Sequence, residues 1–242
     1  MVRLNKYLAQ CNMGSRRSVE ALISNRRIKI NGITTTDLST IVDEEKDVVE
    51  VDDKILKRTS EKIYLMQNKP PKYVVTKKDE LNRSTVYDLL PDFGVNIFSI
   101  GRLDYMSEGL LLFTNDGDFS EKIIHPRYKL PKLYKVKVKG NMNTIQLEQL
   151  RKGVKISGKV TQPAIVHVKR RTSEVTILRM TIFEGRKRQI RYMLKAIGSE
   201  VLELKRLQIG NLKLGKLPPG MWRMLKPTEI RSLLNYKEQR KK

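Results

Sequence analysis

The amino-acid sequence predicts an α+β protein with a small N-terminal unit and a larger, strongly basic second unit. The first observation is length, because 242 residues suit one large domain or two small ones. The second is charge: residues 1–33 carry a net charge of +6, residues 34–58 carry −4 and residues 63–242 carry +21. The third is patterning, because apolar residues recur at helical spacing in some segments and alternate with polar residues in others. These observations divide the chain into a domain at 1–58, a linker at 59–62, a domain at 63–235 and a basic tail at 236–242.

The balance of charge indicates a polyanionic partner. The chain has 49 Lys and Arg against 26 Asp and Glu, which gives a formal net charge of +23 and a pI near 10.1. This excess favours nucleic acid over an acidic protein. A membrane surface is disfavoured, because the basic residues are not gathered on one amphipathic helix. The alternative is an ordinary solvated basic surface.

Composition argues against several other classes of protein. With 39% hydrophobic and 31% charged residues the chain is typical of a soluble globular protein, and no run reaches the about 20 apolar residues of a membrane helix. The first ten residues lack the apolar core of a secretory signal, and Cys11 is the only cysteine, so we expect a cytoplasmic protein without an internal disulfide. His125 and His167, far apart in sequence, and one cysteine argue against a structural zinc site.

The N-terminal unit is predicted to contain two helices followed by a small β-hairpin. Apolar residues at positions 4, 7, 8 and 11 have helical spacing, and Ser15 is predicted to cap a second helix. The segment RIKINGI alternates apolar and polar residues and contains Asn31-Gly32, which favours a hairpin turn. The residues alone leave two interpretations open, a phosphate-contacting module and an ordinary small α+β domain.

This segment resembles the small RNA-binding domain named after ribosomal protein S-four, also called the alpha-L domain. The resemblance covers about residues 2–55 and rests on RLNKYLAQCNMGSRRSVEALISNRRIKING. It implies that one face of the unit grips folded RNA. The basic residues that it makes candidates for RNA binding are Arg3, Lys6, Arg16, Arg17, Arg26, Arg27 and Lys29.

An acidic residue in an unusual place marks the second unit. The segment NIFSIGRLD is predicted to be a strand that ends near Arg102 and Asp104, and GLLLFTN is predicted to be a buried strand. The six residues DYMSEG then form a surface loop between two buried elements, which is where catalytic groups often lie. From spacing alone, Asp104 is better explained as a turn residue that bonds its own backbone.

Two further segments carry candidate site residues. RQIRYMLKAIG is predicted to be a helix that ends before Gly198, with Arg191 on a face different from its apolar one. KLYKVKVKG alternates like a strand and contains Tyr134. Without further information Arg191 belongs to a solvated basic face, Tyr134 is an ordinary strand aromatic, and Leu204 in LELKR is a core residue.

The second unit resembles the RNA pseudouridine synthases of the RsuA type. Its segment GRLDYMSEGLLLFTNDGDF matches their active-site motif, and it is followed in order by HPRYKLPKLYKVKVKG, FEGRKRQIRYMLKAIG and VLELKRLQIGNLKLGKLPPGMWRML. Together with the N-terminal unit, the resemblance spans nearly the whole chain. It implies a catalytic domain built on a mixed, mainly antiparallel sheet with flanking helices. The implied activity is the conversion of a uridine in ribosomal RNA to pseudouridine, as an isomerase without a cofactor or a metal.

The resemblance also implies a role for particular residues. Asp104 would be the nucleophile, Arg191 its partner, and Tyr134 the residue that stacks on the target base and has been proposed to remove the proton from carbon 5. Leu204 would pack beside that tyrosine. Arg102 would occupy the space of the extruded base or hold a flanking phosphate, although a simple ion pair with a nearby carboxylate is the alternative. The candidates for phosphate contacts beside the site are Lys187 and Arg188.

Several functional alternatives stay open. Large-subunit ribosomal RNA is the favoured target, because MGSRR and LLLFTNDG resemble the RluB-like branch of these enzymes, and small-subunit ribosomal RNA is second. A non-catalytic RNA-binding factor of ribosome assembly and a general DNA-binding protein are further alternatives. Tyr105, Met106 and Glu108 fill variable loop positions and are candidates for reading the sequence around the target. We expect a monomer that acts on naked RNA or on an assembly intermediate.

Overall fold

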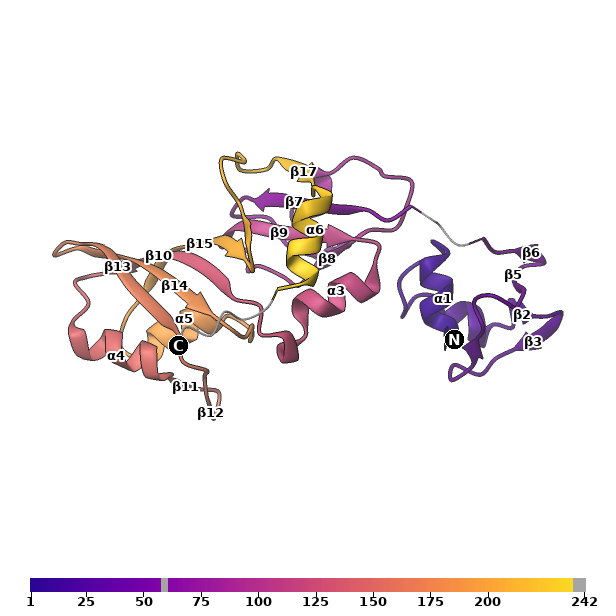
Figure 1. Cartoon of the computed structure of the whole chain (residues 1–242), viewed down its shortest axis with the longest axis horizontal. Helices are drawn as coiled ribbons and strands as arrows, with labels where there is room; N and C mark the ends of the chain where they lie inside the picture. The colour runs from indigo at the N-terminus through magenta and orange to yellow at the C-terminus, as the bar shows by residue number, and fades with distance from the viewer. Residues whose placement is uncertain (58–60, 237–242) are drawn as a thin grey trace. The chain divides into compact units, whose positions relative to one another are not determined.

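The computed structural model describes residues 1–57 and 61–236, and these form two compact units (Figure 1). The first unit consists of the described part of Met1–Ile63 together with Asp92–Phe98, and the second of Tyr64–Pro91 and the described part of Ser99–Lys242. The predicted division did not anticipate that Asp92–Phe98 belongs with the N-terminal residues. Residues 59 and 60 of the predicted linker at 59–62, and residues 237–242 of the predicted basic tail at 236–242, lie outside the described residues.

The first unit has the predicted helices and hairpin. Its helices and strands are β1 (Val2–Arg3), α1 (Leu4–Gln10), α2 (Glu20–Ser24), β2 (Ile28–Ile30), β3 (Ile33–Thr35), β4 (Ile41–Val42), β5 (Val49–Val51) and β6 (Lys54–Ile55). Strands β3, β2, β5 and β6 form an antiparallel sheet in that order, and β1 pairs with β4. One apolar cluster that includes Leu4, Leu8, Ile23 and Ile28 joins both helices to the strands.

Two local details of this unit differ from the prediction or extend it. Helix α2 begins at Glu20 with Val19 as its N-cap, so Ser15 does not cap it. Ser15 instead exchanges hydrogen bonds with Ser18 one turn earlier, since each hydroxyl accepts from the other residue's backbone N–H, at 2.8 and 3.1 Å. Asn12 holds the segment Asp92–Phe98 by donating to the carbonyl of Gly94.

The second unit is built on one nine-stranded sheet. Its main path runs in the order β13 (Ile165–Arg171), β14 (Val175–Ile182), β10 (Lys132–Lys139), β15 (Val201–Ile209), β9 (Glu108–Thr114), β7 (Tyr64–Lys69) and β17 (Trp222–Met224). Off this path, β8 (Phe98–Ile100) pairs with β9 and β16 (Leu212–Lys213) pairs with β15. The pair of β9 with β15 is parallel, and the other pairs along the main path are antiparallel. The predicted fold class, with a mixed and mainly antiparallel sheet, is confirmed.

Helices cover the two halves of this sheet and create two apolar cores. Around β10, β14 and β15, one core takes in Leu147 and Leu150 of α4 (Thr144–Lys152) and Ile190 and Leu194 of α5 (Gln189–Ala196). The remaining helices are α3 (Gly117–Ile124) and α6 (Pro227–Leu234), which contribute to a second core around β9. The short elements outside the sheet are η1 (Val86–Leu89), η2 (Pro126–Tyr128), β11 (Lys155–Ile156) and β12 (Lys159–Val160). No helix in residues 1–57 or 61–236 is long and apolar enough to cross a membrane.

Candidate active site

A buried lysine holds the loop that carries Asp104. This loop runs between β8 and β9, and the N–H of Ser107 donates to the carbonyl of Asp104 at 2.9 Å, which closes a tight turn. The Lys69 side chain is fully buried, and its Nζ donates to the carbonyls of Pro70 (2.9 Å), Tyr105 (3.3 Å) and Ser107 (2.8 Å). An ammonium has three protons to donate, so the charged lysine satisfies all three carbonyls. Burial lowers the pKa of Lys69 to about 8, and the negative charges of Asp104 and Glu108 oppose this change only in part.

The loop is shorter than the sequence predicted. Strand β9 begins at Glu108, whose carboxylate accepts from Lys205 of β15, so Glu108 belongs to the sheet and not to the loop. Tyr105 is 39% and Met106 52% exposed, and the Arg83 guanidinium lies 5.7 Å from the centre of the Tyr105 ring. Of the three residues considered for reading sequence context, Tyr105 and Met106 therefore remain candidates.

Asp104 forms an ion pair with Arg191 of helix α5. The distance from Oδ2 of Asp104 to Nε of Arg191 is 3.7 Å, with the two side chains 28% and 14% exposed. Nη1 and Nη2 of the same guanidinium donate to the carbonyls of Val201 (3.3 Å) and Met106 (3.5 Å). Burial lowers the pKa of Arg191, and the charge of Asp104 opposes that change. Helix α5 faces this way because Ile190, on its apolar side, is anchored in the core.

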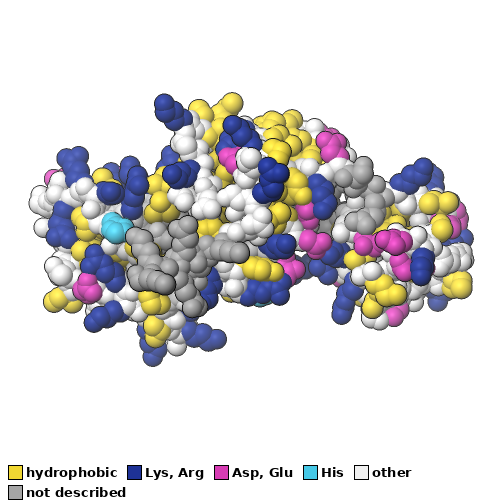
Figure 2. Space-filling model, viewed as in Figure 1, with side chains coloured by type: hydrophobic (Ala, Val, Ile, Leu, Met, Phe, Trp, Pro, Cys, Tyr) yellow, Lys and Arg dark blue, Asp and Glu magenta, His cyan; other side chains and the backbone are white. Residues whose placement is uncertain are grey.

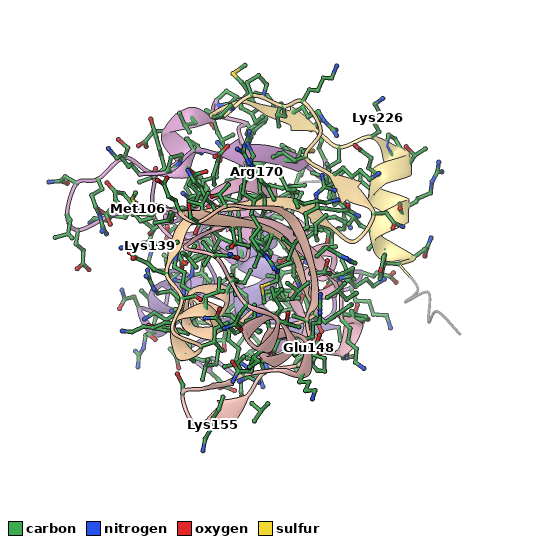
Figure 3. The ribbon with its side chains drawn as sticks, turned by 90° about the vertical axis from the view of Figure 1, so that its left-hand side faces the viewer. Met106, Lys139, Glu148, Lys155, Arg170 and Lys226 are labelled. Carbon is green, nitrogen blue, oxygen red and sulfur yellow. The ribbon has the colours of Figure 1, made fainter. Side chains whose placement is uncertain are left out.

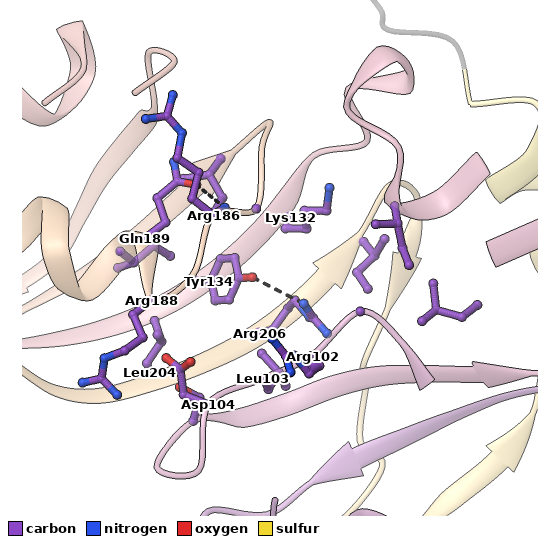
Figure 4. Close-up of a pocket in the computed structure, with 18 of the residues that line it drawn as sticks. Arg102, Leu103, Asp104, Lys132, Tyr134, Arg186, Arg188, Gln189, Leu204 and Arg206 are labelled. Carbon is purple, nitrogen blue, oxygen red and sulfur yellow. Dashed lines mark hydrogen bonds between the residues drawn. The ribbon is translucent and has the colours of Figure 1, made fainter. Parts of the chain in front are cut away.

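Beside the ion pair lies a pocket of about 270 Å³ (Figure 4). Asp104 and Arg102 reach it from the β8–β9 loop, Tyr134 from β10 and Leu204 from β15. Tyr134 and Leu204 are each 7% exposed, and both belong to the same apolar core. The pocket lining therefore combines an aromatic and an aliphatic side chain with a carboxylate. Such a site suits a flat ring that must meet a nucleophile at its edge.

Two cations that lie on strands, Arg206 and Lys132, also line the pocket. Arg206 of β15 is 6% exposed, its Nε donates to the carbonyl of Leu110 at 2.7 Å, and its Nη1 lies 3.5 Å from the Tyr134 hydroxyl (Figure 4). Lys132 is half-buried on β10, and burial together with the charge of Arg206 lowers the pKa of Lys132 to about 8. Among the residues that line the pocket, Asp104 is the only carboxylate.

The other basic residues predicted beside the site lie at its rim. Arg188 and Arg102 both line the pocket with exposed side chains. Arg188 has a left-handed backbone conformation at the start of α5. Lys187 is exposed next to Arg188, although it is not among the lining residues. Further out, Lys139 on β10, Arg170 on β13 and Lys155 on β11 are also exposed (Figure 3).

The basic residues predicted in the first unit fall into two groups. Arg27 donates twice to the carboxylate of Asp52, and Lys29 donates to Asp53, so the acidic half of this unit neutralises both. The remaining five are exposed or half-exposed, and they are Arg3, Lys6, Arg16, Arg17 and Arg26. Over the visible surface of each unit, Lys and Arg are scattered and do not follow a single helix (Figure 2).

Sequence reasoning did not find Lys69, Lys132 and Arg206. For the last two a signal existed, because alternate residues of a strand share one face. Lys132 lies two residues before Tyr134, and Arg206 lies two residues after Leu204, so each shares a strand face with a residue that was already a candidate. For Lys69 there was no signal, since a lysine at the end of a strand is ordinarily exposed.

Two family models match the chain, one in each unit. The model described as RNA pseudouridylate synthase matches residues 63–196, which is more than half of the chain and includes Asp104, Tyr134 and Arg191. The model described as the S4 domain matches residues 2–49 of the first unit.

Individual relatives cover almost the full length of the chain. An uncharacterized RNA pseudouridine synthase of Aquifex aeolicus is 40% identical over 233 residues, which is 96% of this chain and 93% of the relative. The ribosomal large subunit pseudouridine synthase B of Bacillus subtilis is 37% identical over 235 residues, 96% of each protein. A solved structure described as a pseudouridylate synthase superimposes with a TM-score of 0.71 at 29% identity, and covers 96% of this chain and all of that one. The chain therefore belongs to the family of RNA pseudouridine synthases of the RsuA type, which are isomerases that act on uridine in RNA.

Proposed function

We propose that this protein converts a specific uridine of large-subunit ribosomal RNA to pseudouridine, with Asp104 as the nucleophile. The observation that carries the proposal is the ion pair between Asp104 and Arg191 at the mouth of a pocket walled by Tyr134 and Leu204. The charged guanidinium of Arg191 pairs with the carboxylate that would act as the nucleophile and holds it beside the pocket. The same guanidinium fixes the position of the loop through the Met106 carbonyl.

The pocket walls support the handling of the base. In this proposal the uracil stacks on Tyr134 and packs against Leu204 while its bond to the ribose breaks, and Asp104 lies beside the sugar and the ring. The ring then turns, and carbon 5 is joined to the ribose. Because the product contains the same atoms as the substrate, the reaction consumes no second substrate.

A uridine in folded RNA must leave its stack before it meets Asp104. Extrusion of a base costs a few kcal/mol, and contacts between cationic side chains and phosphates offset that cost. Arg102 and Arg188 stand exposed at the rim of the pocket, where the backbone on either side of an extruded nucleotide would pass. We assign Arg102 to the vacated space or a flanking phosphate, and Arg188 with its neighbour Lys187 to further phosphates.

The choice of ribosomal RNA rests on the comparisons. The relative from Bacillus subtilis is named for the large ribosomal subunit, and the first unit matches the S4 domain. We therefore infer a cytoplasmic enzyme in which the first unit adds RNA affinity through its exposed basic residues. Small-subunit ribosomal RNA is the second candidate target.

Release of tritium from RNA labelled at carbon 5 of uracil tests this function. The purified protein should release tritium from large-subunit ribosomal RNA without any added cofactor, because carbon 5 loses its hydrogen when it bonds to the ribose. Asp104→Asn keeps the shape of the side chain but removes its charge, and it should release none. Release only from small-subunit RNA would correct the target and leave the chemistry in place.

Two results would overturn the catalytic proposal. One is full release by Asp104→Asn. The other is the absence of release from both ribosomal RNAs and from assembly intermediates isolated from cells that lack the protein, with RNA binding retained. The second result would leave an RNA-binding assembly factor.

A further inference from the structure

The guanidinium of Arg206 is buried with one donor group unused. Nε and Nη1 are directed to the Leu110 carbonyl and the Tyr134 hydroxyl, but Nη2 has no hydrogen-bond partner among the described residues. The residue is 6% exposed, so water replaces that partner poorly. A buried, unpaired donor costs about 1–3 kcal/mol, and more on a charged group, so such a group ordinarily has a partner.

The charge around Arg206 is also uncompensated. Lys132 lies close enough for the charge of Arg206 to lower its pKa, and no ion pair is formed by either cation among the described residues. The one carboxylate in the lining, Asp104, is paired with Arg191. Two desolvated cations in one pocket repel each other, and a bound anion would relieve that repulsion.

We propose that Arg206 and Lys132 bind the oxygen-bearing edge of the uracil ring and stabilise the negative charge that the ring acquires when it separates from the ribose. This assignment rests on the proposed function and adds a second electrostatic element to the site, distinct from the pair of Asp104 and Arg191.

The chemistry requires such a stabilising element. When the bond from N1 of uracil to C1′ of ribose breaks, its electron pair stays on N1, and the charge spreads to the carbonyl oxygens O2 and O4. The Asp104 carboxylate bonds to C1′ in place of N1. After the ring turns, carbon 5 attacks C1′ and displaces that carboxylate, and the proton that leaves carbon 5 is matched by a proton that N1 takes up. Donors placed where charge develops lower the barrier to bond breaking, and removal of one such donor typically costs about 10²–10³-fold in rate.

The geometry favours the base over a phosphate as the occupant. A ring stacked on the face of Tyr134 presents its edge near the hydroxyl end of that side chain, and Nη1 of Arg206 lies 3.5 Å from the hydroxyl oxygen (Figure 4). Tyr134, beside the guanidinium, and Leu204, in the same pocket lining, are each 7% exposed, and this apolar lining suits a flat ring better than a hydrated phosphodiester. The exposed cations at the rim, Arg102 and Arg188, are the better phosphate ligands.

Arg206→Gln tests the assignment, because it keeps hydrogen-bond donors and removes the charge. With saturating tritium-labelled ribosomal RNA in a single turnover, the rate of tritium release should fall at least about 10²-fold, while the dissociation constant for RNA changes less than about threefold. Arg206→Lys should recover part of the rate. Arg179→Gln, which removes the same charge from an exposed position of β14, is the matched control and should retain the wild-type rate.

Two results for Arg206→Gln would overturn the assignment. A rate equal to that of the control is one. The other is weaker RNA binding with an unchanged rate at saturating RNA, together with a slope of log affinity against log salt that is reduced by about one. That combination indicates that Arg206 contacts a phosphate. If the wild-type protein itself releases no tritium, the proposed function fails instead, so the two failures are distinguishable.

Lys132 gives an independent test if Arg206→Gln does not fold. The other charged residues that line the pocket are Arg102, Asp104, Arg186, Arg188 and Arg206. The arginines keep their charge across the accessible range, so loss of the Lys132 charge near its pKa of about 8 should lower the wild-type rate above that pH. Lys132→Arg should extend the active range to higher pH, and Lys132→Gln should be slow throughout. An alkaline decline that is identical in wild type and Lys132→Arg would contradict the assignment.

Discussion

Asp104 and Arg191 form an ion pair that joins the β8–β9 loop to helix α5, with 3.7 Å between Oδ2 of the carboxylate and Nε of the guanidinium. The two residues are 87 positions apart in the sequence. Arg191 also donates to the backbone of the same loop at Met106 and to β15 at Val201. One side chain thus sets both the charge beside Asp104 and the position of its loop.

Arg191→Met should lower the single-turnover rate of tritium release about 10²-fold or more, because it removes the cation that pairs with Asp104 and contacts its loop. Arg191→Lys should lower the rate less, because it keeps the positive charge. It does not keep the three simultaneous contacts of the guanidinium with Asp104, Val201 and Met106. Lys195→Met, on the exposed side of the same helix, is the control for loss of a cation from α5. Equal rates for Arg191→Met and Lys195→Met would show that the ion pair is not needed.

Lys69 should make the stability of the fold depend on pH. Burial lowers the pKa of Lys69 from 10.5 to about 8, so between these values the unfolded chain binds more protons than the folded one. Stability therefore rises with pH across this window. Urea unfolding measures this effect. As the pH rises from about 7.5 to about 9.5, the free energy of unfolding of the wild type should increase relative to that of Lys69→Met. Exposed Lys213, changed to Met, should show no such trend. A trend equal to that of the control would mean that Lys69 is not buried as described.

Gly109 should tolerate no side chain. It has a φ of +114° and pairs with Arg206, where β9 and β15 run parallel, and a Cβ at this position would lie 2.2 Å from the carbonyl oxygen of Arg206. Gly109→Ala should cost about 2–4 kcal/mol of stability, from the clash and the strained φ together. Gly117→Ala, at the first residue of α3 with open space around it, should be neutral or slightly stabilising. Thermal or urea unfolding of both variants measures the difference, and equal stabilities would contradict the close approach.

The first unit should bind RNA through its exposed cations, among them Arg16 and Arg17. Replacing Arg16 and Arg17 together by Ala should weaken RNA binding and reduce the slope of log affinity against log salt by up to about two. Arg27→Ala is the matched control, because the Arg27 guanidinium is already paired with Asp52. Removing this guanidinium should leave the slope nearly unchanged. Filter binding at several salt concentrations measures both. A larger change in slope for Arg27→Ala would mean that RNA displaces Asp52.

The sequence predicted the elements that carry the candidate site because their patterns are local. The alternation in β10 places Tyr134 on a strand, and the apolar periodicity of α5 leaves Arg191 off its buried face. The mixed sheet and the family followed from motifs in order along the chain, and both are confirmed. The ends of elements were less predictable: β9 begins at Glu108 and α2 at Glu20, since pairing with β15 and packing of the first unit decide these ends.

Sequence by itself determined which residues are available to the site: the carboxylate of Asp104, the tyrosine on β10, the basic helix, and a charge of +23 suited to RNA. Only the tertiary structure decided that Lys69 is buried beneath the loop and that Arg206 keeps an unpaired donor beside Tyr134. Both depend on the register between strands far apart in sequence, above all the parallel pairing of β9 with β15. Burial and pairing of a charge are set by such non-local contacts, which no local pattern of residues encodes.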